Sequence, residues 1–330
     1  MANTAPDISN FASQSTAGDK IYLAPMEGIA DAPMREILTK YGDFDDCTSE
    51  FIRVTDVVLP KKTLLREVPE LSCGCRTPSG KVVRVQFLGD NPKTMLATAR
   101  KAVSMGATYI DLNFGCPSRW VQHAGAMLLL EPELLHRIVS EVREGLDGSV
   151  SLSVKIRTGF RDKKECADIV RAVAVPGVSE ITIHARTRKD LYSREALDWT
   201  VIAEMRQYAG GIELVANGDI DSVESFRRCR ELTGCTRFMV GRGALMMPNI
   251  PGVLRGTARA LTNSGIFAVI LDFFELLQSL GFREKSVLDR TKQFMSYART
   301  NNDEITELFK SYCRLKNADE AKSFLIHEVR

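Results

Sequence analysis

Along about the first two thirds of the chain, short apolar runs alternate with segments that have the apolar spacing of a helix. Residues 150–156 alternate apolar and polar side chains, as a half-buried strand does, whereas residues 91–105 place apolar side chains at helical spacing. We predict strands at residues 21–24, 44–48, 81–87, 109–113, 150–156, 180–183, 213–216 and 237–240. We predict helices between them at residues 32–41, 91–105, 132–146, 166–175, 200–208 and 222–232.

This alternation, over about 230 residues, is typical of a closed (β/α)8 TIM barrel, an α/β fold whose active site lies at the carboxyl ends of the strands. A polar residue stands at or just beyond the carboxyl end of each predicted strand: Glu27, Glu50, Gln86, Asn113, Lys155, His184, Asn217 and Arg242. An open doubly wound sheet is the alternative. It requires a glycine fingerprint after the first strand, and Ala-Pro-Met-Glu-Gly at 24–28 is not one.

Beyond Pro248 and Pro251 the alternation stops and helical spacing continues alone, in runs that begin near Phe267, Leu288 and Ile305. We therefore predict a C-terminal helical bundle behind the barrel. The predicted domains are a flexible N-terminal tail at 1–19, a catalytic barrel at 20–255 and a helical domain at 256–330.

Composition narrows the class of protein further. The net charge is only +2 over 330 residues, so an acidic partner must be met by a local patch rather than by the whole molecule. The eight cysteines are irregularly spaced and residues 1–19 are polar, without the apolar core of a secretory signal, so we expect a cytoplasmic protein. Cys73 and Cys75 lack a second pair at zinc spacing, and no apolar run reaches about 18 residues. We expect neither a metal site nor a membrane span.

The stretch 109–117 carries the strongest chemical signal. An apolar strand runs into Asn113 and then stops at Gly115, Cys116 and Pro117, so a thiol is delivered into a tight loop at the predicted active-site end. A thiol with an ordinary pKa near ~8.5 is mostly protonated at neutral pH and suits a proton donor. A buried structural cysteine is the alternative interpretation.

Two glycine-containing triplets, Asn217-Gly218-Asp219 and Gly241-Arg242-Gly243, close the last two predicted strands. In a barrel these loops commonly bind phosphate through backbone N–H groups, although each alone could be an ordinary turn. Lys155 ends an apolar strand and is costly to bury without an anionic partner, such as the pyrimidine edge of a reduced flavin. Alternatively, its side chain extends to the barrel mouth.

The helical domain carries a basic stretch at residues 283–300. It contains Arg283, Lys285, Arg290, Lys292 and Arg299 against Glu284 and Asp289. Such an excess next to a barrel mouth suits a phosphate backbone, but charge alone favours a solvated helix face.

With these motifs in order, the chain resembles the flavin-dependent tRNA dihydrouridine synthases. The likeness covers about residues 20–315 and rests on seven motifs, at residues 24–28, 85–89, 113–117, 154–157, 184–187, 217–219 and 241–244. It implies reduction of the C5–C6 bond of a tRNA uridine by FMN, with NADPH as electron donor and Cys116 as the acid. It implies FMN contacts at Pro25, Met26, Glu27, Gln86, Lys155, His184, Asn217, Gly218, Asp219, Gly241 and Arg242.

Residues 49–54 and 290–297 look most like the bacterial dihydrouridine synthase C subgroup, which acts on uridine 16 of the D loop. By that likeness the tRNA contacts would be Arg53, Asn113, Tyr192, Arg290 and Lys292, in a protein expected to be monomeric. One departure is the loop between Val121 and Leu128, about two residues shorter than is usual in the family. Two alternatives therefore stay open: a small-molecule flavin oxidoreductase of the dihydroorotate or dihydropyrimidine type, and a tRNA-binding protein with impaired catalysis.

Overall fold

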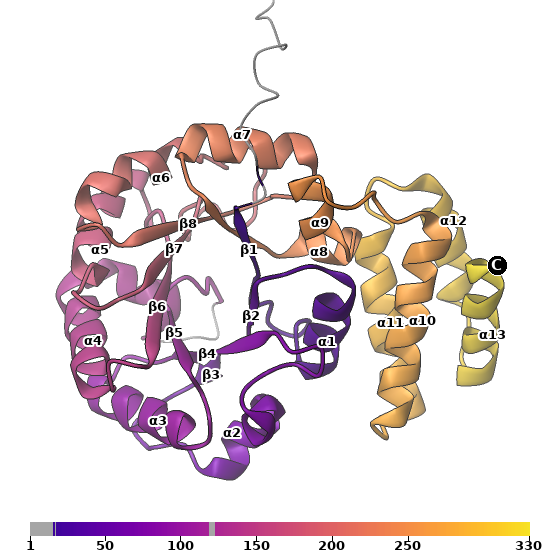
Figure 1. Ribbon diagram of the computed structural model, residues 1–330, viewed down its shortest axis with the longest axis horizontal. Helices are drawn as coiled ribbons and strands as arrows, with labels where there is room; N and C mark the ends of the chain where they lie inside the picture. Colours follow the sequence, from indigo (N-terminus) through magenta and orange to yellow (C-terminus); the bar gives the residue numbers. More distant parts are fainter. Residues whose placement is uncertain (1–15, 17, 119–122) are drawn as a thin grey trace, which may run out of the picture.

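The computed structural model describes residues 16, 18–118 and 123–330 and confirms the predicted TIM barrel (Figure 1). The sheet is parallel throughout, and it closes because β1 pairs with both β2 and β9 while β2 also pairs with β4. The barrel strands are β1 (Lys20–Leu23), β2 (Asp46–Thr48), β4 (Val82–Leu88), β5 (Tyr109–Asn113), β6 (Ser151–Arg157), β7 (Glu180–His184), β8 (Glu213–Asn217) and β9 (Arg237–Val240). A further two-residue strand, β3 (Ile52–Arg53), pairs beside the end of β4.

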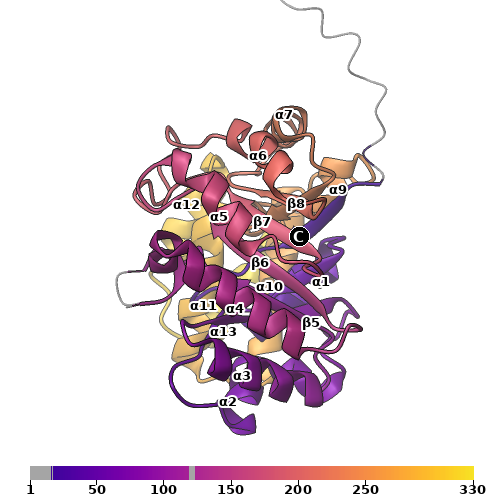
Figure 2. The ribbon, with the colours of Figure 1, turned by 90° about the vertical axis from the view of Figure 1, so that its left-hand side faces the viewer.

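Helices form the outer layer and cover the strands, as Figure 2 shows for the side that carries β5–β7. Side-chain caps start several of them: Asp31 accepts from Met34 N, and Asn91 accepts from Lys93 N and Thr94 N. The barrel helices are α1 (Ala32–Tyr41), α2 (Lys61–Glu67), α3 (Pro92–Ser104), α4 (Pro132–Gly145), α5 (Cys166–Val173), α6 (Thr200–Met205), α7 (Val223–Thr233), α8 (Arg242–Met246) and α9 (Ile250–Arg255). Short 3-10 turns occur at Pro69–Cys73, Gly125–Leu130, Lys163–Glu165 and Arg206–Tyr208.

Three of these helices escaped the sequence prediction. In α2 only Leu64 is buried, so its sequence shows no apolar period. The helices α8 and α9 have five and six residues, too few to show the apolar spacing of a helix in the sequence. The Gly241–Gly243 turn is thus the start of α8, and a Cβ at Gly243 would lie 2.5 Å from the Ile220 carbonyl oxygen. Glycine at 243 therefore permits the close approach of α8 to the loop after β8.

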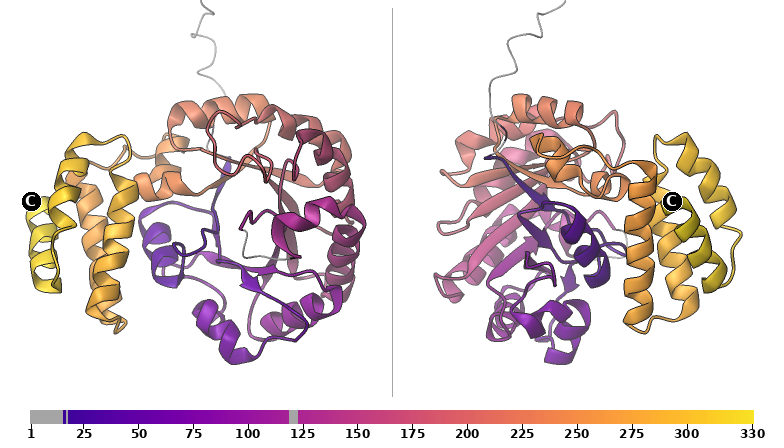
Figure 3. Two further views of the ribbon diagram at one scale, coloured as in Figure 1. Left: turned by 180° about the vertical axis from the view of Figure 1, so that it is seen from behind. Right: turned by 45° about the vertical axis from the view of Figure 1, so that its right-hand side comes forward.

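The C-terminal helices stand against one side of the barrel (Figure 3). They are α10 (Asn263–Ser279), α11 (Glu284–Ala298), α12 (Asp303–Tyr312) and α13 (Ala318–Val329), of which α13 was not predicted. The pair Lys40–Asp272, at 2.7 Å, joins α1 to α10, and Arg290 of α11 pairs with Asp31. Among the described residues no helix is long and apolar enough to cross a bilayer.

A charged cluster closes the end of the barrel opposite the strand carboxyl ends. Arg84 is 1% exposed and forms ion pairs with Glu180 at 2.6 Å and with Asp46 at 3.1 Å. Its guanidinium carbon lies 3.8 Å from the ring centroid of Tyr22 and 4.3 Å from that of Tyr109. Burial alone would raise the pKa of Glu180, but Arg84 and the hydrogen bonds to this carboxylate hold that pKa below its usual value.

Removing Glu180 should therefore leave Arg84 as a buried, poorly compensated charge. We expect Glu180→Ala to lower the free energy of unfolding by about 3–5 kcal/mol in equilibrium urea unfolding. Glu213→Ala is the matched control, because Glu213 is a half-exposed carboxylate 3.7 Å from Arg237 and should contribute only about 0–1 kcal/mol. Equal effects of the two substitutions would show that the cluster does not support the barrel.

Candidate active site

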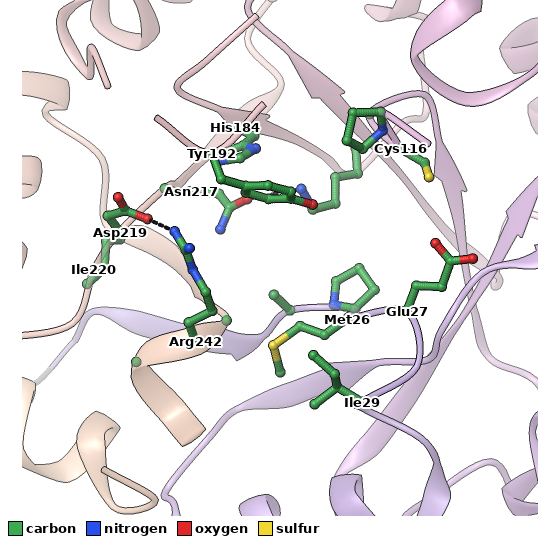
Figure 4. Close-up of a pocket in the computed structure, with 18 of the residues that line it drawn as sticks. Met26, Glu27, Ile29, Cys116, His184, Tyr192, Asn217, Asp219, Ile220 and Arg242 are labelled. Carbon is green, nitrogen blue, oxygen red and sulfur yellow. Dashed lines mark hydrogen bonds and ion pairs between the residues drawn. The ribbon is translucent and has the colours of Figure 1, made fainter. Parts of the chain in front are cut away.

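A pocket of about 630 Å³ opens at the carboxyl ends of the strands (Figure 4). The chain positions that the sequence predicts as cofactor contacts all line it: Pro25, Met26, Glu27, Gln86, Lys155, His184, Asn217, Gly218, Asp219, Gly241 and Arg242. Cys116, Asn113 and Tyr192 line it as well. Tyr297 of α11 and Thr300 complete the wall, so the C-terminal helices contribute to the same pocket.

The thiol of Cys116 is positioned by its own backbone. Asn113 Oδ1 accepts hydrogen bonds from Gly115 N and Cys116 N, both at 2.9 Å. The Cys116 carbonyl accepts from Ala126 N at 3.0 Å, so the chain returns past the thiol. Gly125 permits this return: its φ is +58°, and a Cβ there would lie 3.1 Å from the Cys116 carbonyl oxygen. Burial raises the pKa of the Cys116 thiol, which keeps it protonated at neutral pH.

The shortened loop that the sequence predicts after Cys116 lies partly outside the described residues, at 119–122. His123, just beyond them, is exposed and has a φ of +55°.

Lys155 of β6 lines the pocket. Its Nζ donates to Asn217 Oδ1 at 3.0 Å, and Asn217 in turn donates to the Met239 carbonyl at 2.8 Å. Burial, with a further contribution from Arg157, lowers the pKa of Lys155 to about 8. The ammonium is thus largely charged at neutral pH, yet an anion placed beside it would stabilise it further.

Asp219 lies in the loop after β8, which the sequence predicts to bind phosphate, and it contacts two arginines. Its carboxylate pairs with Arg186 and with Arg242, each at 2.5 Å, and these two arginines outweigh burial and lower its pKa. The adjacent Gly218 has a φ of +128°, and a Cβ there would lie 2.9 Å from Leu197. Asp219 therefore orients Arg242, whose side chain is 45% exposed, toward the pocket (Figure 4).

Arg186 was missed by the sequence prediction, although it stands in the predicted 184–187 motif. It is fully buried, and its Nη1 lies 3.3 Å from His184 Nε2. A guanidinium can only donate, so His184 Nε2 accepts and the ring proton resides on Nδ1. Burial, followed by the surrounding cations, holds the pKa of His184 well below its usual value, so the ring is neutral.

Arg157, the last residue of β6, was also missed. Its guanidinium donates to the Gly115 carbonyl at 2.8 Å and to the carbonyls of Thr187 and Leu191 at 3.0 and 2.8 Å. It thereby joins the Cys116 loop to the loop that carries Tyr192 at the pocket mouth. The only sequence signal was the second basic residue of the motif at 154–157, and Arg194, a further pocket residue, gave no signal at all.

Of the five predicted RNA contacts, two line the pocket and three lie outside it. Asn113 is 6% exposed, and Tyr192 is 54% exposed at the pocket mouth. Arg53 is exposed on β3 and does not line the pocket. Arg290 and Lys292 lie on α11 outside it: Arg290 pairs with Asp31, and Lys292 Nζ donates to the Leu315 carbonyl at 2.7 Å.

Glu50 is the one residue of the predicted strand-end set whose side chain contacts the loop after β1 instead of lining the pocket. It lies at the end of β2, and its carboxylate accepts from Ile29 N at 3.1 Å. Within the described part of the chain, no group of three or more His, Cys, Asp or Glu side chains could hold a metal ion.

The pKa of Lys155 leads to a pH prediction. Because this pKa is about 8 in the folded protein and 10.5 ordinarily, the unfolded chain binds more protons between these values. The stability of the wild-type protein relative to Lys155→Met should therefore rise as the pH increases through this window. Urea unfolding of both proteins, without cofactor, should show a relative gain of about 2–3 kcal/mol between pH ~7 and ~10. A stability difference independent of pH would contradict the buried ammonium.

The chain is similar to known proteins of one family. The family model described as dihydrouridine synthase matches residues 22–322. The tRNA-dihydrouridine(16) synthase of Escherichia coli strain K12 is 38% identical over 303 residues, which cover 91% of this chain and 96% of that protein. The proteins of the same name from Haemophilus ducreyi and Vibrio cholerae are 38% and 37% identical, covering 88% of this chain and 89% and 90% of their own lengths. The resemblance found in the sequence is thereby confirmed: the chain belongs to the dihydrouridine synthase family.

Proposed function

We propose that this protein reduces the C5–C6 double bond of a D-loop uridine in tRNA, at position 16, with FMN as cofactor and NADPH as electron donor. The observation that carries the proposal is the half-buried, protonated thiol of Cys116 in one pocket with Lys155, on a chain of the dihydrouridine synthase family. Position 16 comes from the names of the relatives, which match nearly their full length.

The pocket fits FMN in size and in donor chemistry. Its volume lies within the range of about 300–1,000 Å³ that holds compact organic ligands. Arg242 and the glycines at 218 and 241 offer a charged fork and close backbone approach for a phosphate. Lys155 offers an ammonium for the negative edge of the reduced ring. The residues present therefore match an anionic, planar ligand with a phosphate tail.

Reduction of the C5–C6 bond needs a hydride at C6 and a proton at C5, and different groups would supply them. Bound FMN would supply the hydride for C6 of the uracil ring. Cys116 holds the proton for C5, and it lies on the loop beyond β5 rather than among the predicted phosphate residues. Asn217 orients Lys155 by accepting its hydrogen bond, and Arg157 holds the Cys116 loop against the loop of Tyr192.

The proposed RNA surface runs from Arg53 and Tyr192 at the barrel to Arg290 and Lys292 on α11. The continuity of the pocket wall with α11, through Tyr297, supports a substrate larger than a free base. Because the substrate is tRNA, we place the reaction in the cytoplasm, with one chain forming a complete site.

The role of Cys116 separates the two half-reactions. Cys116→Ala should bind FMN and be reduced by NADPH as the wild type is, because neither step needs the thiol. Oxidation of the reduced enzyme by tRNA should slow by about 10²–10⁴, the usual effect of a positioned acid. Stopped-flow absorbance after mixing prereduced protein with tRNA measures this rate. Reoxidation of the Ala variant at the wild-type rate would rule out Cys116 as the acid.

The contribution of α11 to tRNA binding can be tested separately. Replacing Arg290 and Lys292 together with Ala should raise the tRNA dissociation constant and lower the slope of log K against log salt by about two, or one per phosphate contact. Lys310→Ala is the control, since Lys310 is an exposed cation of α12 paired with Glu307. If the double variant keeps the control's salt slope, these side chains serve only the intramolecular contacts described above.

A further inference from the structure

A buried acid lies one layer below the pocket, on the same strand as Asn113. Asp111 of β5 is in register with Gln86 of β4 and with Ser153 of β6, and all three side chains are at most 1% exposed. Gln86 Nε2 donates to Asp111 Oδ2 at 2.6 Å, and Ser153 Oγ donates to Asp111 Oδ1. Among the described residues no cation forms a salt bridge with Asp111, so hydrogen bonds alone satisfy this carboxylate.

The hydrogen bonds continue from Asp111 to the Cys116 loop. Gln86 Oε1 accepts from Asn113 Nδ2 at 2.8 Å, and Asn113 Oδ1 accepts from the backbone N–H groups of Gly115 and Cys116. We call this chain, Asp111–Gln86–Asn113–Cys116 N, the amide relay. It joins a buried carboxylate to the backbone of the thiol through two side-chain amides.

The backbone end of the amide relay fixes the direction of its hydrogen bonds. Backbone N–H groups can only donate, so Asn113 must turn its oxygen to them and its NH2 to Gln86. Gln86 must then present its oxygen to Asn113 and its NH2 to Asp111. Asp111 Oδ2 accepts this hydrogen bond. Asn113 cannot flip without turning its NH2 to the backbone N–H groups, and Gln86 cannot flip without turning its NH2 to that of Asn113.

We propose that Asp111 is a positioning residue that fixes the backbone of Cys116 through the amide relay, and hence the place of its thiol over the substrate. The part of this inference that concerns catalysis rests on the proposed role of Cys116 as the acid. Asp111 itself is 1% exposed and does not line the pocket, so its effect would be exerted through the amide relay.

The test uses three substitutions in the full-length protein. Asp111→Leu keeps the approximate volume but removes the acceptor. Asp111→Asn keeps one oxygen for Gln86 and can turn its NH2 to the Ser153 hydroxyl. Ser153→Ala removes the other hydrogen bond of Asp111 but leaves the amide relay intact. Asp111→Ala replaces the Leu variant if that variant does not fold.

The first readout is independent of turnover: the rate at which iodoacetamide alkylates the half-buried Cys116 in the flavin-free protein. It is followed on the peptide that contains Cys116, because Cys73 and Cys313 are exposed and would react too. We expect Asp111→Leu to raise this rate by about tenfold, the factor that corresponds to one ordinary hydrogen bond. Asp111→Asn and Ser153→Ala should stay within about twofold of the wild type. Loss of stability without a change in alkylation would overturn the proposal, as would equal effects of Leu and Asn.

The second readout is oxidation of the prereduced, flavin-loaded enzyme by tRNA. A misplaced acid should slow this step by about 10²-fold in Asp111→Leu, with rescue in Asp111→Asn. If alkylation responds as expected while this step does not, Asp111 positions Cys116 but the thiol is not the acid. If neither responds, the amide relay has no positioning role.

Discussion

The two hydrogen bonds that Asn113 accepts from the backbone of Gly115 and Cys116 determine where the thiol can lie. They exist because β5 ends at Asn113, so that its side-chain oxygen meets the loop that follows while its NH2 donates to Gln86 of β4. Arg157 secures the same loop from β6 through the Gly115 carbonyl. Side chains of two neighbouring strands, β5 and β6, therefore hold the loop that carries the thiol.

Buried charges lie at both ends of the barrel, but they are compensated differently at each end. At the amino end, Arg84 and Glu180 neutralise each other within a closed cluster. At the carboxyl end, Arg157 and Arg186 are buried and Lys155 is half-buried. Among the described residues, Asp219 is the only carboxylate that forms a salt bridge with any of the three, through Arg186. Buried cations without matching carboxylates are costly, so this end favours an anionic ligand. The electrostatics of the pocket therefore favour an anionic ligand, such as the proposed FMN.

The sequence was most informative where the structure depends on local pattern. The strand 109–113 and the helix 32–41 have the predicted bounds. The apolar pattern of each, and the Asp31 cap and Pro33 at the start of the helix, act within a few residues. The motif residues converge on one pocket because parallel strands share one carboxyl rim. Arg157, Arg186 and Asp111 were not assigned roles, since their partners lie 25 or more residues away or depend on strand register. Local periodicity carries no such information, and the short helices α8 and α9 escaped for the related reason that they lack a full apolar period.

The proposed reaction is the reduction of uridine 16 of tRNA in this pocket, with NADPH as electron donor. It is tested by reverse-transcription mapping of dihydrouridine in tRNA from cells lacking this protein, after incubation with the purified enzyme, FMN and NADPH. We expect a new dihydrouridine at position 16 that requires both FMN and NADPH. A flavin-loaded, NADPH-reducible protein that leaves position 16 unmodified, or that modifies only another uridine, would contradict it.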